Sequence, residues 1–218
     1  MNRKKLAAWA GMIGPIVFIL VFTLEGLFRL NYNSFEMYIS DLSTGPYGWI
    51  QIVNFIILGI AFLMFTYGVV DEFYDWKMAK AGFILLAIIG FSLLFSGPFI
   101  TDPINTPRHL WTLHGTIHQL FGALVFLLSP VSCFVFWRCF RNNLEWKSLQ
   151  LCTFAAGTIV AITVLFLKIG SIQTSFSTND LTGWLGLIQR TTLIIYLIWI
   201  FTFALILYRR ASKNFRKK

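Results

Sequence analysis

GWLGLIQRTTLIIYLIWIFTFALILY, residues 183–208, is the stretch that decides the fold. It exceeds the ~20 residues that an α-helix needs to cross the hydrocarbon core of a bilayer. Arg190 is the one charged residue in it, and Gln189 stands beside it. The stretch therefore predicts a transmembrane helix that carries one polar pair close to its first turns.

Similar apolar runs precede this one along the chain. They cover roughly residues 6–28, 47–70, 80–101, 111–136 and 148–170. The whole chain of 218 residues is 57% hydrophobic and 12% charged, which leaves too little polar surface for a soluble globule. The connecting segments are too short for a separate soluble domain. We therefore predict an all-α, polytopic membrane protein in which residues 1–218 form one six-transmembrane-helix bundle.

The basic residues predict how this bundle is oriented. All but four of the 18 Lys and Arg residues lie at the two termini or in the loops after the second and fourth runs; the four are Arg29, Arg108, Lys168 and Arg190. The positive-inside rule then places both termini in the cytoplasm, and we expect a multi-pass protein of the cell membrane. Because topology accounts for the net charge of +9, no nucleic-acid partner is expected.

Polar side chains gather in the half of the spans that this orientation places outside the cytoplasm. Such residues are costly in hydrocarbon and usually face a bundle interior or a watery cavity. The sequence thus predicts a polar His/Asp/Arg pocket in the extracytoplasmic leaflet. The candidates for catalysis are His114, His118, Asp41 and Asp102, and those for substrate binding are Arg190, Gln189, Asn54 and Ser43.

The two histidines permit two kinds of chemistry. His114 and His118 are i and i+4 on a predicted helix, so that their rings project from one face about one turn apart. With Asp102 they would supply the three protein ligands that a catalytic divalent metal such as zinc requires. Without a metal, one histidine would act as a general base oriented by Asp41 or Asp102. The sequence does not separate these alternatives.

Arg190 also has two interpretations. At that depth a guanidinium must be paired or solvated. It is either a partner in a buried ion pair with Asp102 or Glu25, or it captures an anion such as a phospholipid headgroup. Pro98 and Pro103 further predict a broken end to the third span, with free backbone carbonyls close to Asp102.

Several motifs together resemble a known family. They are the stretch Tyr38-Ile39-Ser40-Asp41-Leu42-Ser43 before a span that bears Asn54, the Gly97-Pro98 to Asp102 turn, His114 with His118, and Gly186-Leu187-Ile188-Gln189-Arg190. In combination they resemble the six-span prokaryotic membrane family of domain of unknown function 998 (DUF998). A more distant likeness, to eukaryotic membrane proteins of lipid-anchor remodelling and autophagy modulation, implies chemistry on lipids or lipid binding.

Three functions agree with these observations. The first is a membrane-embedded enzyme, either a hydrolase or an acyl or headgroup transferase, that acts on a lipid through His114, His118, Asp41 and Asp102. The second is a transporter or a lipid-binding module that uses the same groups. The third is a non-catalytic interaction protein in which they fix helix packing. Membrane lipid is the expected partner, and the sequence does not predict an oligomeric state.

Overall fold

The computed structural model describes residues 3–73, 76–103, 106–173 and 182–216, and this part of the chain contains helices and no strand. Six helices are long and apolar enough to cross a membrane, which confirms the predicted six-span fold. They are α1 (Arg3–Phe28), α2 (Gly48–Glu72), α3 (Lys77–Ser96), α4 (Leu113–Arg141), α5 (Gln150–Gln173) and α6 (Leu185–Arg216). Short 3-10 helices stand in the connections: η1 (Ile39–Ser43), η2 (Arg108–Leu110), η3 (Lys147–Leu149) and η4 (Thr182–Trp184).

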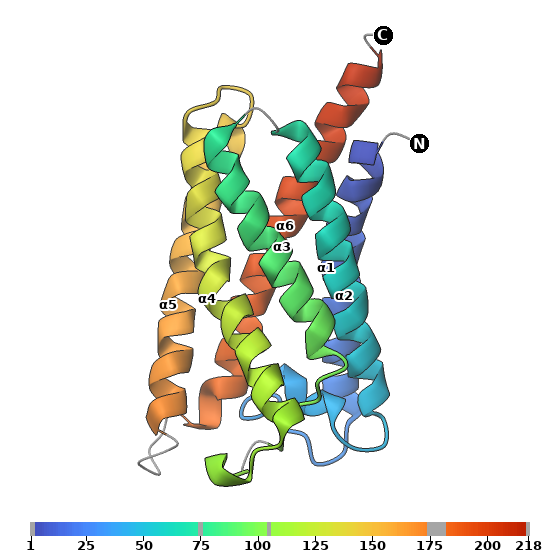
Figure 1. Ribbon diagram of the computed structural model, residues 1–218, viewed down its shortest axis with the longest axis vertical. Helices are drawn as coiled ribbons and strands as arrows, with labels where there is room; N and C mark the ends of the chain where they lie inside the picture. The colour runs from blue at the N-terminus through green and yellow to red at the C-terminus, as the bar shows by residue number, and fades with distance from the viewer. Residues whose placement is uncertain (1–2, 74–75, 104–105, 174–181, 217–218) are drawn as a thin grey trace.

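The six helices form a closed ring in chain order. Each helix packs on the next one, and α6 returns to pack on α1. The N-terminal end of α1 and the C-terminal end of α6 lie at one end of the bundle, at the top of Figure 1. We call this the terminal end, and we call the opposite end, which carries η1 and η2, the distal end.

Aromatic side chains fill the middle of the ring in its terminal half. Phe203 on α6 lies 5.1 Å from the rings of both Phe136 and Phe140 on α4, and 5.3 Å from that of Phe65 on α2. The buried indole N–H of Trp199 donates to the hydroxyl of Thr153 (2.9 Å), as a tryptophan away from the interface requires. Because these side chains fill the inside of the ring in its terminal half, space for a cavity inside the ring remains in the distal half.

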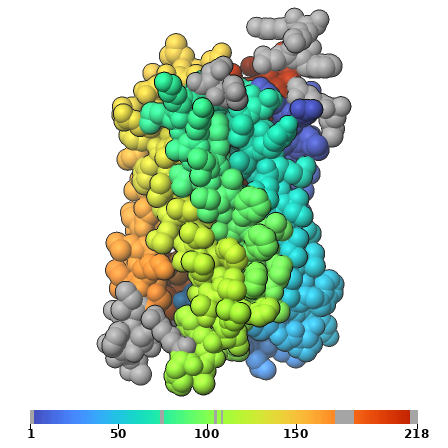
Figure 2. Space-filling model, in the orientation of Figure 1, coloured from blue at the N-terminus to red at the C-terminus, as the bar shows by residue number. Residues whose placement is uncertain are grey.

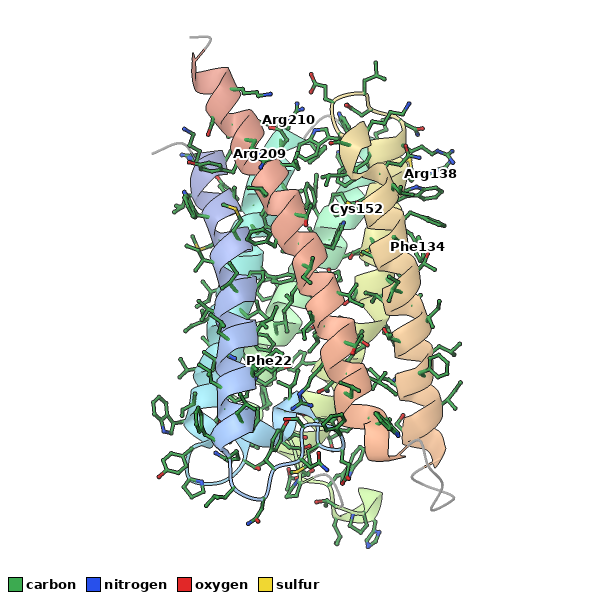
Figure 3. The ribbon with its side chains drawn as sticks, turned by 180° about the vertical axis from the view of Figure 1, so that it is seen from behind. Phe22, Phe134, Arg138, Cys152, Arg209 and Arg210 are labelled. Carbon is green, nitrogen blue, oxygen red and sulfur yellow. The ribbon has the colours of Figure 1, made fainter. Side chains whose placement is uncertain are left out.

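The outer surface of the bundle carries large apolar side chains, as expected for helices surrounded by lipid. Figure 3 shows side chains projecting outward along α1 and α5, and among the exposed ones are Ile13, Leu20, Leu24, Ile162 and Leu165. Exposure of such an apolar surface to water is unfavourable, whereas its contact with lipid acyl chains is favourable.

The helix ends differ from the predicted spans where the chain meets the interface. Helix α3 ends at Ser96, five residues before the predicted boundary, because Pro98 follows and has no N–H to continue the helix. Helix α6 continues to Arg216, beyond the predicted end at Tyr208, because the basic residues after Tyr208 form helix readily outside the bilayer.

Candidate functional site

A cavity of about 140 Å³ lies inside the distal half of the ring. Its walls come mainly from α3, α4, α5 and α6, with Phe55 from α2 and residues 38–40 at the start of the η1 segment. Its polar lining comprises Tyr38, Ser40, Ser96, His118, Gln119, Lys168, Ser171 and Gln189. Figure 2 shows the surface hollowed between α4 and α5 at this level, which is a side of the bundle that would face lipid.

His118 projects from α4 into this cavity with its ring fixed. Its side chain is 5% exposed, and the ring packs edge to face against Phe55 at 6.0 Å between centroids. Nδ1 lies 2.7 Å from the carbonyl oxygen of Phe99 and 3.1 Å from that of Ser96. Because a carbonyl oxygen only accepts, Nδ1 must carry a hydrogen and donate it. In the neutral ring Nε2 is then the nitrogen with a free lone pair.

The two carbonyl groups that hold His118 belong to the broken end of α3. Ser96 is the last residue of α3, and Phe99 follows Pro98. A continuous helix would have used such carbonyls for its own hydrogen bonds. The interruption at Pro98 therefore creates the acceptors that orient the histidine.

Gln189 lines the cavity from α6 and also holds the η1 segment. Its Oε1 accepts a hydrogen bond from the backbone N–H of Ile39 (2.7 Å). Since Oε1 is engaged in this way, the NH₂ of the side chain is the part that can donate to a molecule in the cavity. Ile39 and the neighbouring Tyr38 are thereby kept at the cavity wall.

The start of α6 holds the backbone of residues 34–39 through consecutive contacts. A side chain at Gly186 would overlap with the carbonyl oxygen of Met37 and lie 2.8 Å from that of Ser34, so this position needs glycine. The N–H of Leu187 donates to the carbonyl of Phe35 (3.0 Å). The motif Gly186-Leu187-Ile188-Gln189-Arg190 is therefore a docking platform for this loop.

Arg190 completes this docking platform. Its Nη1 donates to the carbonyl oxygens of Ser34 (2.7 Å), Met37 (2.8 Å) and Gly186 (3.0 Å), and Nη2 donates to the hydroxyl of Tyr32. The guanidinium forms no ion pair with Asp102 or Glu25, and carbonyl oxygens take up Nη1 instead. Anion binding by Arg190 stays a prediction. Arg190 is 8% exposed and acts as a structural clamp.

Asp41 and Ser43 form the internal bonds of η1. The Oδ2 of Asp41 accepts from the backbone N–H of Tyr38 (2.7 Å), and the hydroxyl of Ser43 donates to the carbonyl of Ser40 (2.6 Å). Burial raises the pKa of Asp41 to about 6, although the Tyr38 hydrogen bond and the guanidinium of Arg190 oppose the rise. Asp41 stands behind the residues that line the cavity rather than in its wall.

This pKa makes the stability of the distal loop depend on pH. Because the pKa of Asp41 is higher in the folded state (about 6) than its ordinary value of 3.8, folding favours the protonated carboxyl. Stability should thus fall as pH rises from 4 to 6, by up to about 3 kcal/mol, and stay at the lower level above that. Thermal unfolding in lipid nanodiscs at pH 5 and 7.5 measures this change in stability. Asp41→Asn should be more stable than the wild type at pH 7.5, and its stability should lack the part of the pH dependence that comes from Asp41. If Asp41→Asn shows the same pH profile as the wild type, Asp41 is not the group responsible.

Asp102 and His114 lie apart from the cavity lining. The carboxylate of Asp102 accepts from the backbone N–H (3.0 Å) and the hydroxyl (2.9 Å) of Thr112, whose hydroxyl in turn accepts from Gly115 N–H (3.0 Å). Asp102 thus fixes the start of α4. His114 is exposed and packs against the ring of Phe99 (5.5 Å).

The predicted metal site receives no support from this arrangement. Across the residues that the structure describes, no group of three or more His, Cys, Asp and Glu side chains is placed to hold a metal ion. Of the three predicted ligands, His118 lines the cavity, His114 is exposed and Asp102 is engaged by Thr112, so the three are not brought together. The Nε2 of His118 itself remains available to a ligand or for general-base chemistry.

Asn54 joins helices rather than lining the cavity. Its Nδ2 donates to the carbonyl of Phe18 on α1 (3.2 Å) and to Oε1 of Gln51 (3.1 Å). Within the described residues, Asn54 Oδ1 and Gln51 Nε2 are buried without a hydrogen-bond partner. The pair lies between α1 and α2 and is absent from the cavity lining.

Lys168 lines the cavity, although the sequence did not place it among the site residues. A lysine near the end of a span reaches the interface through its aliphatic stem, so its position in the sequence indicates no further role. The structure places it in the cavity wall on α5, beside Leu167 and Ser171. No sequence pattern predicts that Lys168 faces the cavity, because the rotation of α5 about its axis depends on its packing against α4 and α6.

Comparison with known proteins gives one match. The family model described as a protein of unknown function (DUF998) matches residues 12–206 of the chain. No curated protein and no solved structure matches. The distant likeness to lipid-remodelling and autophagy-modulating proteins is therefore unsupported.

Proposed function

The chain belongs to the DUF998 family of proteins of unknown function, and we propose that it binds a membrane amphiphile in the cavity between α4 and α5. The polar end of the amphiphile would enter from the side, and its chain would stay in the bilayer. By the positive-inside argument, this site lies in the extracytoplasmic leaflet of the cell membrane. The observation that carries the proposal is a cavity within the spans that has polar side chains in a largely apolar wall and is open between α4 and α5.

The size of the cavity supports this mode of binding. A cavity of about 150 Å³ holds one benzene molecule. The space of about 140 Å³ therefore admits a headgroup fragment or a few methylenes and is far too small for a whole phospholipid. Most of any lipid ligand has to remain outside, between α4 and α5.

The polar lining indicates the chemistry of the group that enters. His118 offers an acceptor at Nε2, Gln189 offers an amide NH₂, and Lys168 brings a positive charge to the rim. Asp and Glu are absent from the described residues of the lining. This set suits a carboxylate or a phosphate that also carries a hydroxyl group.

Filling the cavity tests the proposal. A Cβ at Gly122 meets no atom within 4 Å, and Gly122 lines the cavity, so that Gly122→Phe is expected to fill it without unfolding α4. Gly183 has equally open surroundings outside the lining, which makes Gly183→Phe the matched control. The measurement is photo-crosslinking of a diazirine-bearing fatty acid and of a diazirine-bearing lysophosphatidylglycerol to protein in nanodiscs.

We expect labelling of α4 and α5 peptides to fall at least about fivefold in Gly122→Phe and to stay unchanged in Gly183→Phe. Circular dichroism checks that both variants keep their helices. Equal labelling of all three proteins, or labelling spread evenly over the six helices, would refute the proposal.

A second candidate, a lipid-directed hydrolase or transferase, is favoured by the fixed tautomer of His118. A histidine whose Nδ1–H is held by carbonyls presents Nε2 as a general base. The hydroxyls of Ser96 and Ser43 donate to the carbonyls of Ser92 and Ser40, so a water molecule is the better nucleophile. Release of fatty acid from lysophosphatidylglycerol by the wild type, and its loss in His118→Asn, would establish this activity.

A further inference from the structure

A second hollow, of about 380 Å³, lies at the terminal end of the bundle, between the start of α3 and the end of α4. Trp76 and Lys77 line one side of it, and Arg138, Asn142 and Asn143 line the other. Figure 3 shows Arg138 at the edge of the bundle, at the same end as Arg209 and Arg210. This hollow is far from the distal cavity and shares no residue with it.

The cations of the hollow differ from those elsewhere at this end. Lys4 lies 2.8 Å from Glu72, and Arg210 contacts both Glu72 (3.2 Å) and Glu145. Lys77 and Arg138, by contrast, form no ion pair with any carboxylate of the described residues. Basic side chains of α1 and α6 thus pair with these carboxylates, and the hollow keeps an excess of positive charge.

The sequence around the hollow supports this excess. Lys80 and Arg141 follow Lys77 and Arg138 within one helical turn. The carboxylates Asp71, Glu72 and Glu145 stand close by in the sequence, but they pair with Lys4 or Arg210. Asp75 lies outside the described residues.

Uncharged donors complete the lining. The Oδ1 of Asn143 accepts from the backbone N–H of Glu145 (2.8 Å), which leaves its NH₂ as a donor. Helix α3 starts at Lys77 without a side-chain cap from Trp76. The N–H of Ala79 donates to the carbonyl of Trp76 (3.0 Å), which leaves the N–H groups of the first two residues of α3 as donors at the helix start. Two cations and several N–H donors around one hollow are the groups that bind a phosphate.

We propose that this hollow binds the phosphate group of an anionic phospholipid from the leaflet at the terminal end. Trp76 and Trp137 mark the bilayer interface there, since tryptophan concentrates at headgroup depth. A volume of about 380 Å³ is ample for a glycerophosphate headgroup, compared with about 150 Å³ for benzene. Basic pockets between transmembrane helices bind such headgroups.

Native mass spectrometry of the full chain, titrated with phosphatidylglycerol or with phosphatidylcholine, tests this proposal. The test variant is Lys77→Gln/Arg138→Gln. The control is Arg209→Gln/Lys213→Gln, which removes the same charge from exposed positions on α6 at the same end. We expect the test variant to weaken phosphatidylglycerol binding roughly tenfold, the control to weaken it by less than about twofold, and phosphatidylcholine to bind weakly to all three proteins.

Inorganic phosphate serves as the competitor that separates the two sources of a phosphate group, and it is added at low ionic strength so that it does not simply screen the charges. If it displaces the lipid from the wild type, a free phosphate rather than a headgroup is the ligand, and the proposal is overturned. Equal weakening in the test and control variants would overturn it as well, because binding would then follow net charge alone. Thermal unfolding checks that both variants fold.

Discussion

Replacing Arg190 by glutamine is expected to lower the stability of the folded protein by about 3 kcal/mol. The change leaves the carbonyl oxygens of Ser34 and Met37 and the hydroxyl of Tyr32 without the donor that now holds them. Arg190 is 8% exposed, so water replaces the lost bonds poorly. For a chain of this size such a loss corresponds to a fall in Tm of about 6–12 °C.

Thermal unfolding in nanodiscs measures the global effect, and hydrogen exchange of residues 32–43 measures the local one. Arg209→Gln is the matched control, because it makes the same substitution at an exposed position on the same helix. Arg190→Lys keeps the charge but loses the planar fork, and it should fall between the two. A Tm for Arg190→Gln within 2 °C of the Arg209→Gln value (about 0.5–1 kcal/mol) would show that the docking platform does not hold the loop.

The second large effect is expected at His118. Asparagine places its amide NH₂ close to where the Nδ1–H of histidine lies, so His118→Asn can still donate to the carbonyls of Phe99 and Ser96. It has no counterpart of Nε2. Nε2 accepts, so the bond lost is the one from a hydroxyl of the ligand. Binding of the lysophosphatidylglycerol probe should therefore weaken by up to about tenfold, the value of one hydrogen bond between neutral groups (about 0.5–1.5 kcal/mol), while Tm changes little.

His118→Ala provides the comparison that separates positioning from binding. It loses both the donor and the acceptor, leaves two carbonyls in a buried place without a partner, and should lower both Tm and probe affinity. If His118→Asn binds the probe as well as the wild type does, Nε2 takes no part in recognition. In that event His118 serves only to close the broken end of α3.

Much of the fold could be predicted from the sequence because the signal is local. Each span is set by its own apolar run, as for residues 183–208 and α6. The order of the helices in the ring and their rotation depend on contacts between distant segments, for example Phe203 with Phe65 and Phe136. These contacts have no signature in any single run.

Of the eight predicted site residues, His118 and Gln189 line the cavity, and their function stays a prediction. The contacts of Arg190 could not be predicted, because its partners are loop carbonyls, which every residue possesses and no sequence pattern marks. His114 was paired with His118 by helical spacing, but it stands in the first turn of α4, where the helix has just begun and the side chain is exposed.

The opening between α4 and α5 has a kinetic consequence (Figure 2). A ligand that arrives through the side of the bundle never passes through water, so its solubility does not limit its capture. The relevant concentration is its mole fraction in one leaflet, and encounter is a two-dimensional search. Occupancy would then report the composition of that leaflet, and a scarce lipid would compete with abundant ones by its share of the surface.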